Sequence, residues 1–302
     1  MTDTNINWKA IWIIALMIFS FCLFSKSLNV KANPESDLKG YNIAIYNNLG
    51  TDEYLLSRIA LQNMFLWMKA TVENITASEI QNGKLSEFDL FVMPGRSEST
   101  SYYELEELGV NNLLRYIREG GAYFGICGGA SFAARSDVNI FSGAMQPVPG
   151  ESIIAHMVEM RINTQCKAPN LSNMNETFSI LFWGSTYFIP EDHSQINTIA
   201  VYSNCNESGM ITYRFGLGSV FLSSPHGEFE ENSDRDGTDA FDINNDPDSE
   251  WELMLKVSQW LVSASKDKII FIWTASFGGG AIVAAFLTVF IIKKRKSTNA
   301  KS

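Results

Sequence analysis

The stretch Gly120–Gly129 reads Gly-Gly-Ala-Tyr-Phe-Gly-Ile-Cys-Gly-Gly, and it decides how the rest of the sequence is interpreted. Its first half is short, apolar and uncharged, which is typical of a strand buried on both faces of a sheet. Two glycines follow Cys127 directly, and residues 130–134 indicate the start of a helix. A nucleophile on a sharp strand-to-helix turn needs small neighbours, because the strained backbone leaves little room beside it. The stretch therefore predicts that Cys127 is presented at the end of a buried strand.

The place of Cys127 before a helix has a chemical consequence. The N–H of Gly128 would lie at the helix N-terminus, where it can stabilise an oxyanion and favour the thiolate form of the cysteine. The alternative is a buried structural cysteine in a glycine-rich turn, since cysteine is a common core residue. A general base elsewhere in the sequence would decide between these interpretations.

His226 and Glu228 supply a candidate base, in the sequence Ser224-Pro-His-Gly-Glu228 beyond an apolar run that predicts a strand. Residues i and i+2 of an extended segment point the same way, so the carboxylate can hold one imidazole nitrogen while the other faces a thiol. The other histidines, His156 and His193, stand in no motif, and we assign them structural or surface roles. A cysteine elbow with a His-x-Glu pair downstream favours an α/β hydrolase with a cysteine nucleophile.

The remaining pattern predicts the fold around this site. Up to about residue 136, strands alternate with helices, which implies a parallel sheet with helices on both faces. Beyond it come extended segments, a hairpin that turns near Gly216–Gly218, an acidic loop and a closing amphipathic helix. We predict an α/β domain with a doubly wound, mainly parallel, flavodoxin-like sheet. The predicted strands and helices are residues 41–46, 55–67, 71–76, 88–93, 102–119, 122–126, 153–162, 179–189, 196–203, 213–222 and 251–262.

Two apolar segments bracket this domain. The first, Ala10–Phe24, is near the length of a signal-peptide core, so we assign residues 1–32 to a signal peptide, with an uncleaved anchor as the alternative. The second, residues 269–292, is long enough to cross a bilayer and ends at a basic cluster that should stay in the cytoplasm. The sequence thus predicts a single-pass type I membrane protein, with residues 33–268 outside the cytoplasm and 293–302 as its basic cytoplasmic tail.

Charge narrows the choice of partners. The formal net charge is −10 even though the C-terminal tail is basic, so the predicted external domain is strongly acidic. Nucleic acid is therefore a poor partner. The sequence predicts no cofactor and identifies no protein partner.

A pair of cysteines and an acidic loop can each be interpreted in two ways. Cys166 and Cys205 are left over once the elbow and the signal segment are assigned, so they form a possible disulfide, with two free thiols as the alternative. In the acidic loop, Asp234, Asp236 and Asp239 flank a glycine, and Asp242, Asp246 and Asp248 follow. Oxygen ligands at such alternate positions could hold Ca²⁺, with Asp234, Asp236 and Asp239 as the candidates, although the spacing does not match an EF-hand. The alternative is a loop that is simply solvated, and no other metal site is predicted.

Three motifs together resemble the class I glutamine amidotransferase-like superfamily, and within it the domain at the N-terminus of some eukaryotic biotin–protein ligases. They are Met93-Pro-Gly95, Gly120–Ala130 and Ser224–Glu228, and the resemblance covers about residues 40–264. It implies that Cys127 is the nucleophile, His226 the base and Glu228 the acid that orients the base. It also implies that the Gly95–Arg96 loop supplies a second oxyanion N–H beside that of Gly128.

The resemblance has two departures. Gly227 stands where amidotransferases usually have proline, and no ligase or synthetase domain follows, so biotin ligation is not implied. Two functions are therefore expected. The first is a membrane-anchored, cysteine-dependent amide hydrolase that acts on a small amide or peptide outside the cytoplasm. The alternative is a catalytically silent ectodomain that binds a ligand or partner.

Overall fold

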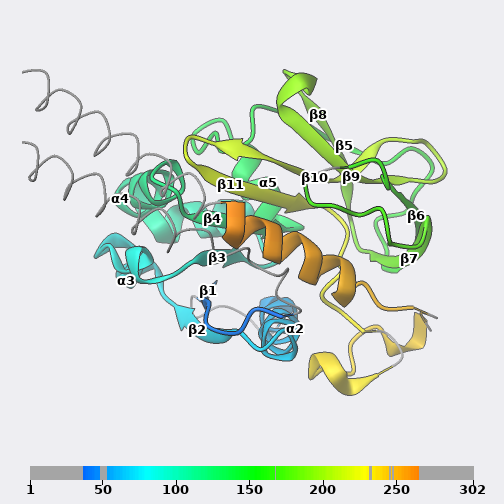
Figure 1. Cartoon of the computed structure of the whole chain (residues 1–302), viewed down its shortest axis with the longest axis horizontal. Coiled ribbons are helices and arrows are strands. Elements are labelled where there is room, and N and C mark those ends of the chain that lie inside the picture. The colour runs from blue at the N-terminus through cyan, green and yellow to red at the C-terminus, as the bar shows by residue number, and fades with distance from the viewer. Residues whose placement is uncertain are drawn as a thin grey trace, which may run out of the picture. The chain divides into compact units, whose positions relative to one another are not determined.

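The computed structural model describes residues 37–47, 53–166, 168–230, 233–244, 246 and 248–264 (Figure 1). The predicted signal peptide, transmembrane segment and cytoplasmic tail lie outside these residues. Among the helices of the described ranges, none is both long enough and apolar enough to span a bilayer.

A nine-stranded sheet forms the centre of the domain, in the order β2-β1-β3-β4-β11-β10-β9-β6-β7. Strands β2, β1, β3, β4 and β11 pair in parallel, and we call them the parallel half. From β11 onward every pairing is antiparallel, and β10, β9, β6 and β7 are the antiparallel half. The strands are β1 Asn42–Tyr46, β2 Thr71–Ile75, β3 Leu90–Met93, β4 Ala122–Ile126, β6 His156–Ile162, β7 Thr177–Phe182, β9 Ile196–Tyr202, β10 Ser208–Phe215 and β11 Gly218–Ser223.

Helices cover both faces of the parallel half. Figure 1 shows α2 and the unlabelled C-terminal helix, residues 251–264, on one side of it, with α3, α4 and α5 on the other. The labelled α-helices are α2 Glu53–Trp67, α3 Ala77–Gln81, α4 Glu98–Arg118 and α5 Gly128–Ala134. Short 3₁₀ turns are η1 Lys84–Glu87, η2 His193–Gln195, η3 Asp234–Asp236 and η4 Asp242–Asn244. The prediction of a mixed α/β fold with helices on both faces is confirmed.

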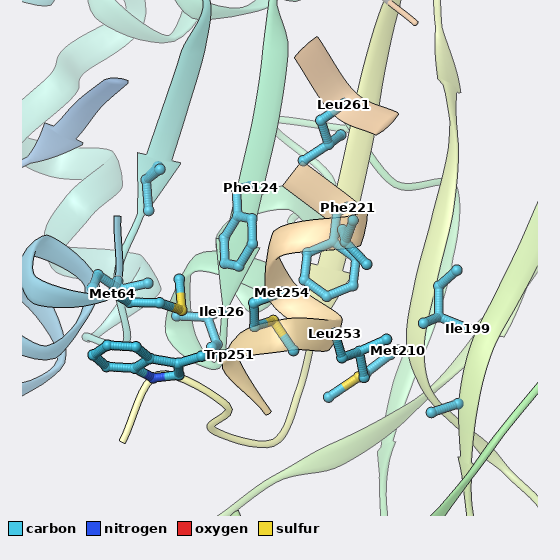
Figure 2. Close-up of a cluster of buried hydrophobic side chains, with 14 of the residues drawn as sticks. Met64, Phe124, Ile126, Ile199, Met210, Phe221, Trp251, Leu253, Met254 and Leu261 are labelled. Atoms are coloured by element: carbon cyan, nitrogen blue, oxygen red, sulfur yellow. The ribbon is translucent and has the colours of Figure 1, made fainter. Parts of the chain in front are cut away.

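Alternate side chains of the buried strands pack into two separate hydrophobic cores, one on each face of the sheet. In β1, Ile43 and Ile45 pack with α2 and the C-terminal helix, whereas Ala44 and Tyr46 pack with α3, α4 and α5. This alternation follows from the two-residue period of a strand, and apolar residues on both faces mark a strand covered on both sides. Figure 2 shows the first core, in which Trp251, Met254 and Leu261 of the C-terminal helix lie over Phe124 of β4 and Phe221 of β11.

The antiparallel half differs from the sequence prediction in detail. Residues 179–189 were expected as one extended segment, but β7 ends at Phe182 and a new strand, β8, runs from Thr186 to Pro190. Gly184, at φ +59°, lies in the break between them, and β8 pairs with an unpredicted strand, β5 Gly143–Pro147, in a separate two-stranded sheet. The sheet is thus parallel in the half that contains β4 and antiparallel in β10, β9, β6 and β7. The hairpin predicted to turn near Gly216–Gly218 is confirmed as the pair β10–β11.

Candidate active site

The site lies at the carboxyl edge of three neighbouring parallel strands. β4 pairs with β3 on one side and with β11 on the other. Gly95 and Arg96 follow β3, Cys127 follows β4, and His226 follows β11. Because parallel strands end at the same edge of a sheet, the topology brings these three segments together, as it does in other open α/β folds.

Cys127 occupies a strained turn between β4 and α5. Its backbone has φ 48° and ψ −110°, a conformation that a residue with a Cβ rarely adopts. Hydrogen bonds on both sides hold it there: its N–H donates to Ser223 O at 2.8 Å, and its carbonyl accepts from the N–H groups of Ala130 and Ser131. Cys127 is partly exposed.

The two glycines after Cys127 are required by close backbone packing. A Cβ on Gly128 would lie 1.5 Å from the carbonyl oxygen of Arg96, and one on Gly129 would lie 2.1 Å from that of Met93. Real Cβ atoms do not approach backbone so closely, so the elbow rests directly on the segment after β3. The sequence Cys-Gly-Gly is thus explained by contact with the neighbouring strand end as well as by the turn itself.

His226 and Glu228 form a buried pair beside the elbow. The Nδ1–H of His226 donates to Oε1 of Glu228 at 3.0 Å, and both side chains are almost fully buried. The indole Nε1–H of Trp251 donates to the main-chain oxygen of Glu228 at 3.1 Å, which fixes the backbone of the pair. Gly227, where proline is usual in the resembling family, packs against Met254 and Glu250.

Ser57 of α2 completes this arrangement, and the sequence analysis did not identify it. Its Oγ–H donates to Oε1 of Glu228 at 2.6 Å, and its Oγ accepts the N–H of Gly95 at 2.9 Å. One hydroxyl therefore connects the acid of the pair to the loop after β3. The contact spans 171 residues of sequence, and a serine within an amphipathic helix gives no local sign of it.

Cys127 and His226 face the same small space next to Gly95. A Cβ on Gly95 would lie 3.0 Å from Cε1 of His226 and 3.4 Å from Cβ of Cys127. Burial by itself lowers the pKa of His226, but the charges of Cys127 and Glu228 outweigh burial and hold that pKa well above its ordinary value. Nε2 of His226 is buried, and within the described residues it has no well-aligned hydrogen-bond partner. Cys127 is nevertheless close enough that its charge and a side-chain hydrogen bond both contribute to the raised pKa of His226.

Aromatic rings enclose the imidazole. Trp183 and Phe229 lie 5.6 Å and 5.7 Å from the centre of the His226 ring, and Phe241 packs against both of them. Such an apolar surround excludes water from the His226–Glu228 pair and strengthens the interaction between their charges.

The predicted oxyanion donors are backbone N–H groups of the Gly95–Arg96 loop and of Gly128. The N–H of Gly95 donates to Ser57, so it is already engaged. The guanidinium of Arg96 is buried against Glu104, at 2.9 Å, and lies over the ring of Tyr46. Gly128 is the first residue of α5, where backbone N–H groups have no partner within the helix. Its N–H remains the simplest donor for an oxyanion at Cys127.

The acidic loop does not bring together the three carboxylates chosen from the sequence as calcium candidates. Asp236 is buried, and its two oxygens accept the N–H groups of Thr238 and Glu230, while Asp234 and Asp239 are exposed. Burial, offset in part by these N–H groups, raises the pKa of Asp236 to about 6. The structure does not gather Asp234, Asp236 and Asp239 as ligands. It brings together Asp246, Asp248 and Glu250 instead.

The possible disulfide is not formed. Cys166 and Cys205 are both free thiols. Cys166 is buried in the core beside the antiparallel half, where burial raises the pKa of its thiol, and Cys205 packs at the edge of the same core. The prediction of a bond between them is wrong: apolar packing, rather than a covalent link, accounts for both residues.

Comparison with known proteins supports the resemblance seen in the motifs. The family model described as Biotin-protein ligase, N terminal matches residues 41–146. The matched range contains Gly95, Cys127 and Gly128 and ends before His226. An uncharacterized protein from Chlamydia muridarum (strain MoPn / Nigg) is 28% identical over 158 residues, 46% of this chain. The matched part spans 60% of the length of that relative.

Solved structures support the fold. A protein described as ThuA-like, from Bacteroides uniformis, aligns over 77% of this chain and 95% of its own, with a TM-score of 0.52 at 11% identity. At that identity the likeness shows a shared fold and nothing further. A glutamine amidotransferase from Thermotoga maritima aligns over 76% of this chain and 92% of its own, at 11% identity. Its TM-score of 0.48 is below the range that establishes a common fold.

Proposed function

We propose that this protein is a cysteine-nucleophile amide hydrolase, with Cys127, His226 and Glu228 as its catalytic triad. The substrate class is a small amide or a peptide. The observation that carries the proposal is the connected set of side chains behind the elbow. Ser57 and His226 both donate to Glu228, and His226 in turn faces the strained, partly exposed Cys127.

Each residue has a defined role in the proposed reaction. The thiolate of Cys127 attacks the carbonyl carbon of the amide, and the resulting oxyanion accepts a hydrogen bond from the N–H of Gly128. The imidazolium of His226 then gives its proton to the amine as the C–N bond breaks, which leaves a thioester on Cys127. Water hydrolyses the thioester after His226 takes one of its protons, and Glu228 keeps the ring oriented through Nδ1 throughout.

The raised pKa of His226 supports these roles. An imidazolium that persists near neutral pH stabilises a neighbouring thiolate and provides the proton for the leaving amine. The aromatic surround keeps that proton from exchanging freely with solvent. Both features are suited to a nucleophilic cysteine and would serve no purpose in a purely structural one.

Trapping the acyl-enzyme tests the proposal. We expect p-nitrophenyl acetate to acetylate the full-length protein on Cys127, detected by intact mass and peptide mapping, with release of p-nitrophenol. His226→Ala should abolish rapid acetylation, because the proton acceptor for the thiol is lost. The matched control is Cys205→Ser, which removes another partly exposed thiol and should leave the acetylation unchanged. Equal acetylation of Cys127 in wild type and His226→Ala would contradict the proposal.

A binding function without turnover is the second candidate, and one observation favours it. The N–H of Gly95, an expected oxyanion donor, is occupied by Ser57. If Cys127 is not acetylated although the protein is folded, the binding function would be favoured over the catalytic one.

We also propose that residues 269–292 anchor the enzyme, with the catalytic domain outside the cytoplasm. The apolar length of this segment and the basic cluster after it support this orientation. Protease added to intact cells should remove the domain and spare a C-terminal tag. Digestion of the tag with survival of the domain would reverse the assignment.

A further inference from the structure

Three carboxylates from the loop after the active-site segment converge at the start of the C-terminal helix. We call Asp246, Asp248 and Glu250 the carboxylate cluster. One oxygen from each lies within 4.8 Å of the others. The loop that carries them is drawn in yellow and orange beside the C-terminal helix in Figure 1. None of the three belongs to the proposed triad.

The cluster is buried on one side and open on the other. Asp246 is 1% exposed and Glu250 is 2% exposed, whereas Asp248 faces solvent. Oδ1 of Asp246 accepts the N–H of Asp248 at 3.2 Å, but its Oδ2 is buried with no hydrogen-bond partner in the described part of the chain. An ionised carboxylate in that position is unfavourable unless a cation lies against it.

Arg235, a basic side chain near the carboxylate cluster, is engaged in contacts with other residues. Arg235 pairs with Glu230 at 2.6 Å, donates to Ser249 at 2.8 Å and stacks over Trp251 at 4.2 Å. Within the described residues, neither Asp246 nor Asp248 forms an ion pair with a lysine, arginine or histidine. In the described part of the chain, Asp246 thus has no basic side chain as a counter-ion.

We propose that Asp246, Asp248 and Glu250 bind a calcium ion. Carboxylate oxygens are the ligands of hard cations, and the exposed side at Asp248 leaves room for the waters that complete a Ca²⁺ shell. Two oxygens on one Ca²⁺ lie at most about 5 Å apart, twice a Ca–O distance of about 2.3–2.6 Å, and the three oxygens of the cluster fall within this limit. Mg²⁺ would require the oxygens within about 4.2 Å of one another and a stricter octahedral arrangement.

The proposed ion would connect the loop to the strand and helix around it. Asp248 accepts the N–H of Ser179 on β7 at 3.3 Å. Glu250 packs against Gly227, where a Cβ would lie 3.3 Å from its own Cβ. The next residue, Trp251, donates to the backbone of Glu228. Calcium would therefore hold together β7, the acidic loop and the segment that carries His226 and Glu228.

Terbium luminescence on the metal-free, full-length protein tests this site. Tb³⁺ occupies calcium sites, and Trp251, adjacent to Glu250, should sensitise its emission. We expect Ca²⁺ to displace Tb³⁺ from wild type and Asp246→Asn to weaken Ca²⁺ binding at least tenfold. The matched control is Asp234→Asn, which removes an exposed acid of the same loop and should bind like wild type. Saturating Ca²⁺ should raise the melting temperature of wild type by about 5 °C and leave Asp246→Asn unchanged.

Several results of this experiment would contradict the proposed calcium site. Tb³⁺ emission that is equal in wild type and Asp246→Asn would overturn the site, as would wild type that neither binds Tb³⁺ nor is stabilised by Ca²⁺. Displacement of Tb³⁺ by Mg²⁺ as readily as by Ca²⁺ would overturn the assignment to calcium. If Asp246→Asn does not fold, Asp248→Asn replaces it, because Asp248 is exposed and its loss leaves no buried gap. The outcome does not depend on whether Cys127 is catalytic.

Discussion

The two halves of the sheet differ in what lies closest to their most tightly packed glycines: backbone atoms in the parallel half and side-chain atoms in the antiparallel half. At the carboxyl edge of the parallel half, backbone packs against backbone: Gly128 meets Arg96, and Gly129 meets Met93. In the antiparallel half, the glycine with comparably close neighbours is Gly209, whose missing side chain is bordered by the terminal methyl of Met160 and the ring of Tyr202. Side-chain ends can move aside and backbone cannot. The comparison indicates that the edge with the candidate site is fixed more rigidly than the hairpins beside it.

The largest expected effect on stability comes from substituting alanine for Gly128 in the parallel half and for Gly209 in the antiparallel half. Gly128→Ala should destabilise the domain by more than about 4 kcal/mol, because a Cβ there would overlap the carbonyl of Arg96. Gly209→Ala should cost about 1–3 kcal/mol, since Met160 can change rotamer. Urea unfolding of both variants measures the difference. Equal stability losses would show that the elbow is not the more rigid region.

A smaller effect on stability is expected when a serine hydroxyl that forms hydrogen bonds is removed from each half of the molecule. Ser57→Ala should lower the free energy of unfolding by about 2–3 kcal/mol, because Glu228 and the N–H of Gly95 each lose a buried partner. Ser208→Ala, in the antiparallel half, removes a partly buried hydroxyl pair with Thr198 and should cost about 1 kcal/mol or less. Ser57→Ala should also slow alkylation of Cys127, whereas Ser208→Ala should not. A Ser57→Ala protein with unchanged alkylation would limit Ser57 to a structural role.

The smallest effect is expected at the cysteines beside the antiparallel half. Since Cys166 and Cys205 are free thiols, Cys205→Ala should change the free energy of unfolding by no more than about 0.5 kcal/mol. Denaturing the wild-type protein without reductant should leave both thiols available to iodoacetamide. Protection of this pair, lifted only by reductant, would restore the disulfide that the structure lacks.

The parallel half was predictable because its signals are local. Residues 120–129 hold two glycines that follow a helix, a buried strand and a turn within ten positions, and the structure places β4, Cys127 and α5 accordingly. Likewise, His226 and Glu228 are two residues apart, so their shared orientation follows from an extended backbone.

The features that the sequence did not predict depend on contacts between residues far apart in the sequence. Ser57 acts through Glu228, 171 residues away, and nothing in the helical spacing of α2 indicates that contact. β8 looks like a continuation of β7, yet it leaves the main sheet to pair with β5. Gly184 between them was the one local sign, and a single glycine does not reveal which strand a segment will pair with.

Alkylation of Cys127 across pH tests the central claim most directly, that His226 and Glu228 activate the cysteine. The raised pKa of His226 keeps the imidazolium through neutral pH, and the proposed mechanism pairs that imidazolium with the thiolate form of Cys127. The rate of reaction with iodoacetamide should therefore change little between pH 6 and pH 8. A free thiol, with a pKa of about 8.5, would react about tenfold faster for each added pH unit in this range. At pH 6, His226→Ala should lower the rate about 100-fold and Glu228→Gln about tenfold. A wild-type rate that rises tenfold per pH unit and is unaffected by His226→Ala would contradict the account.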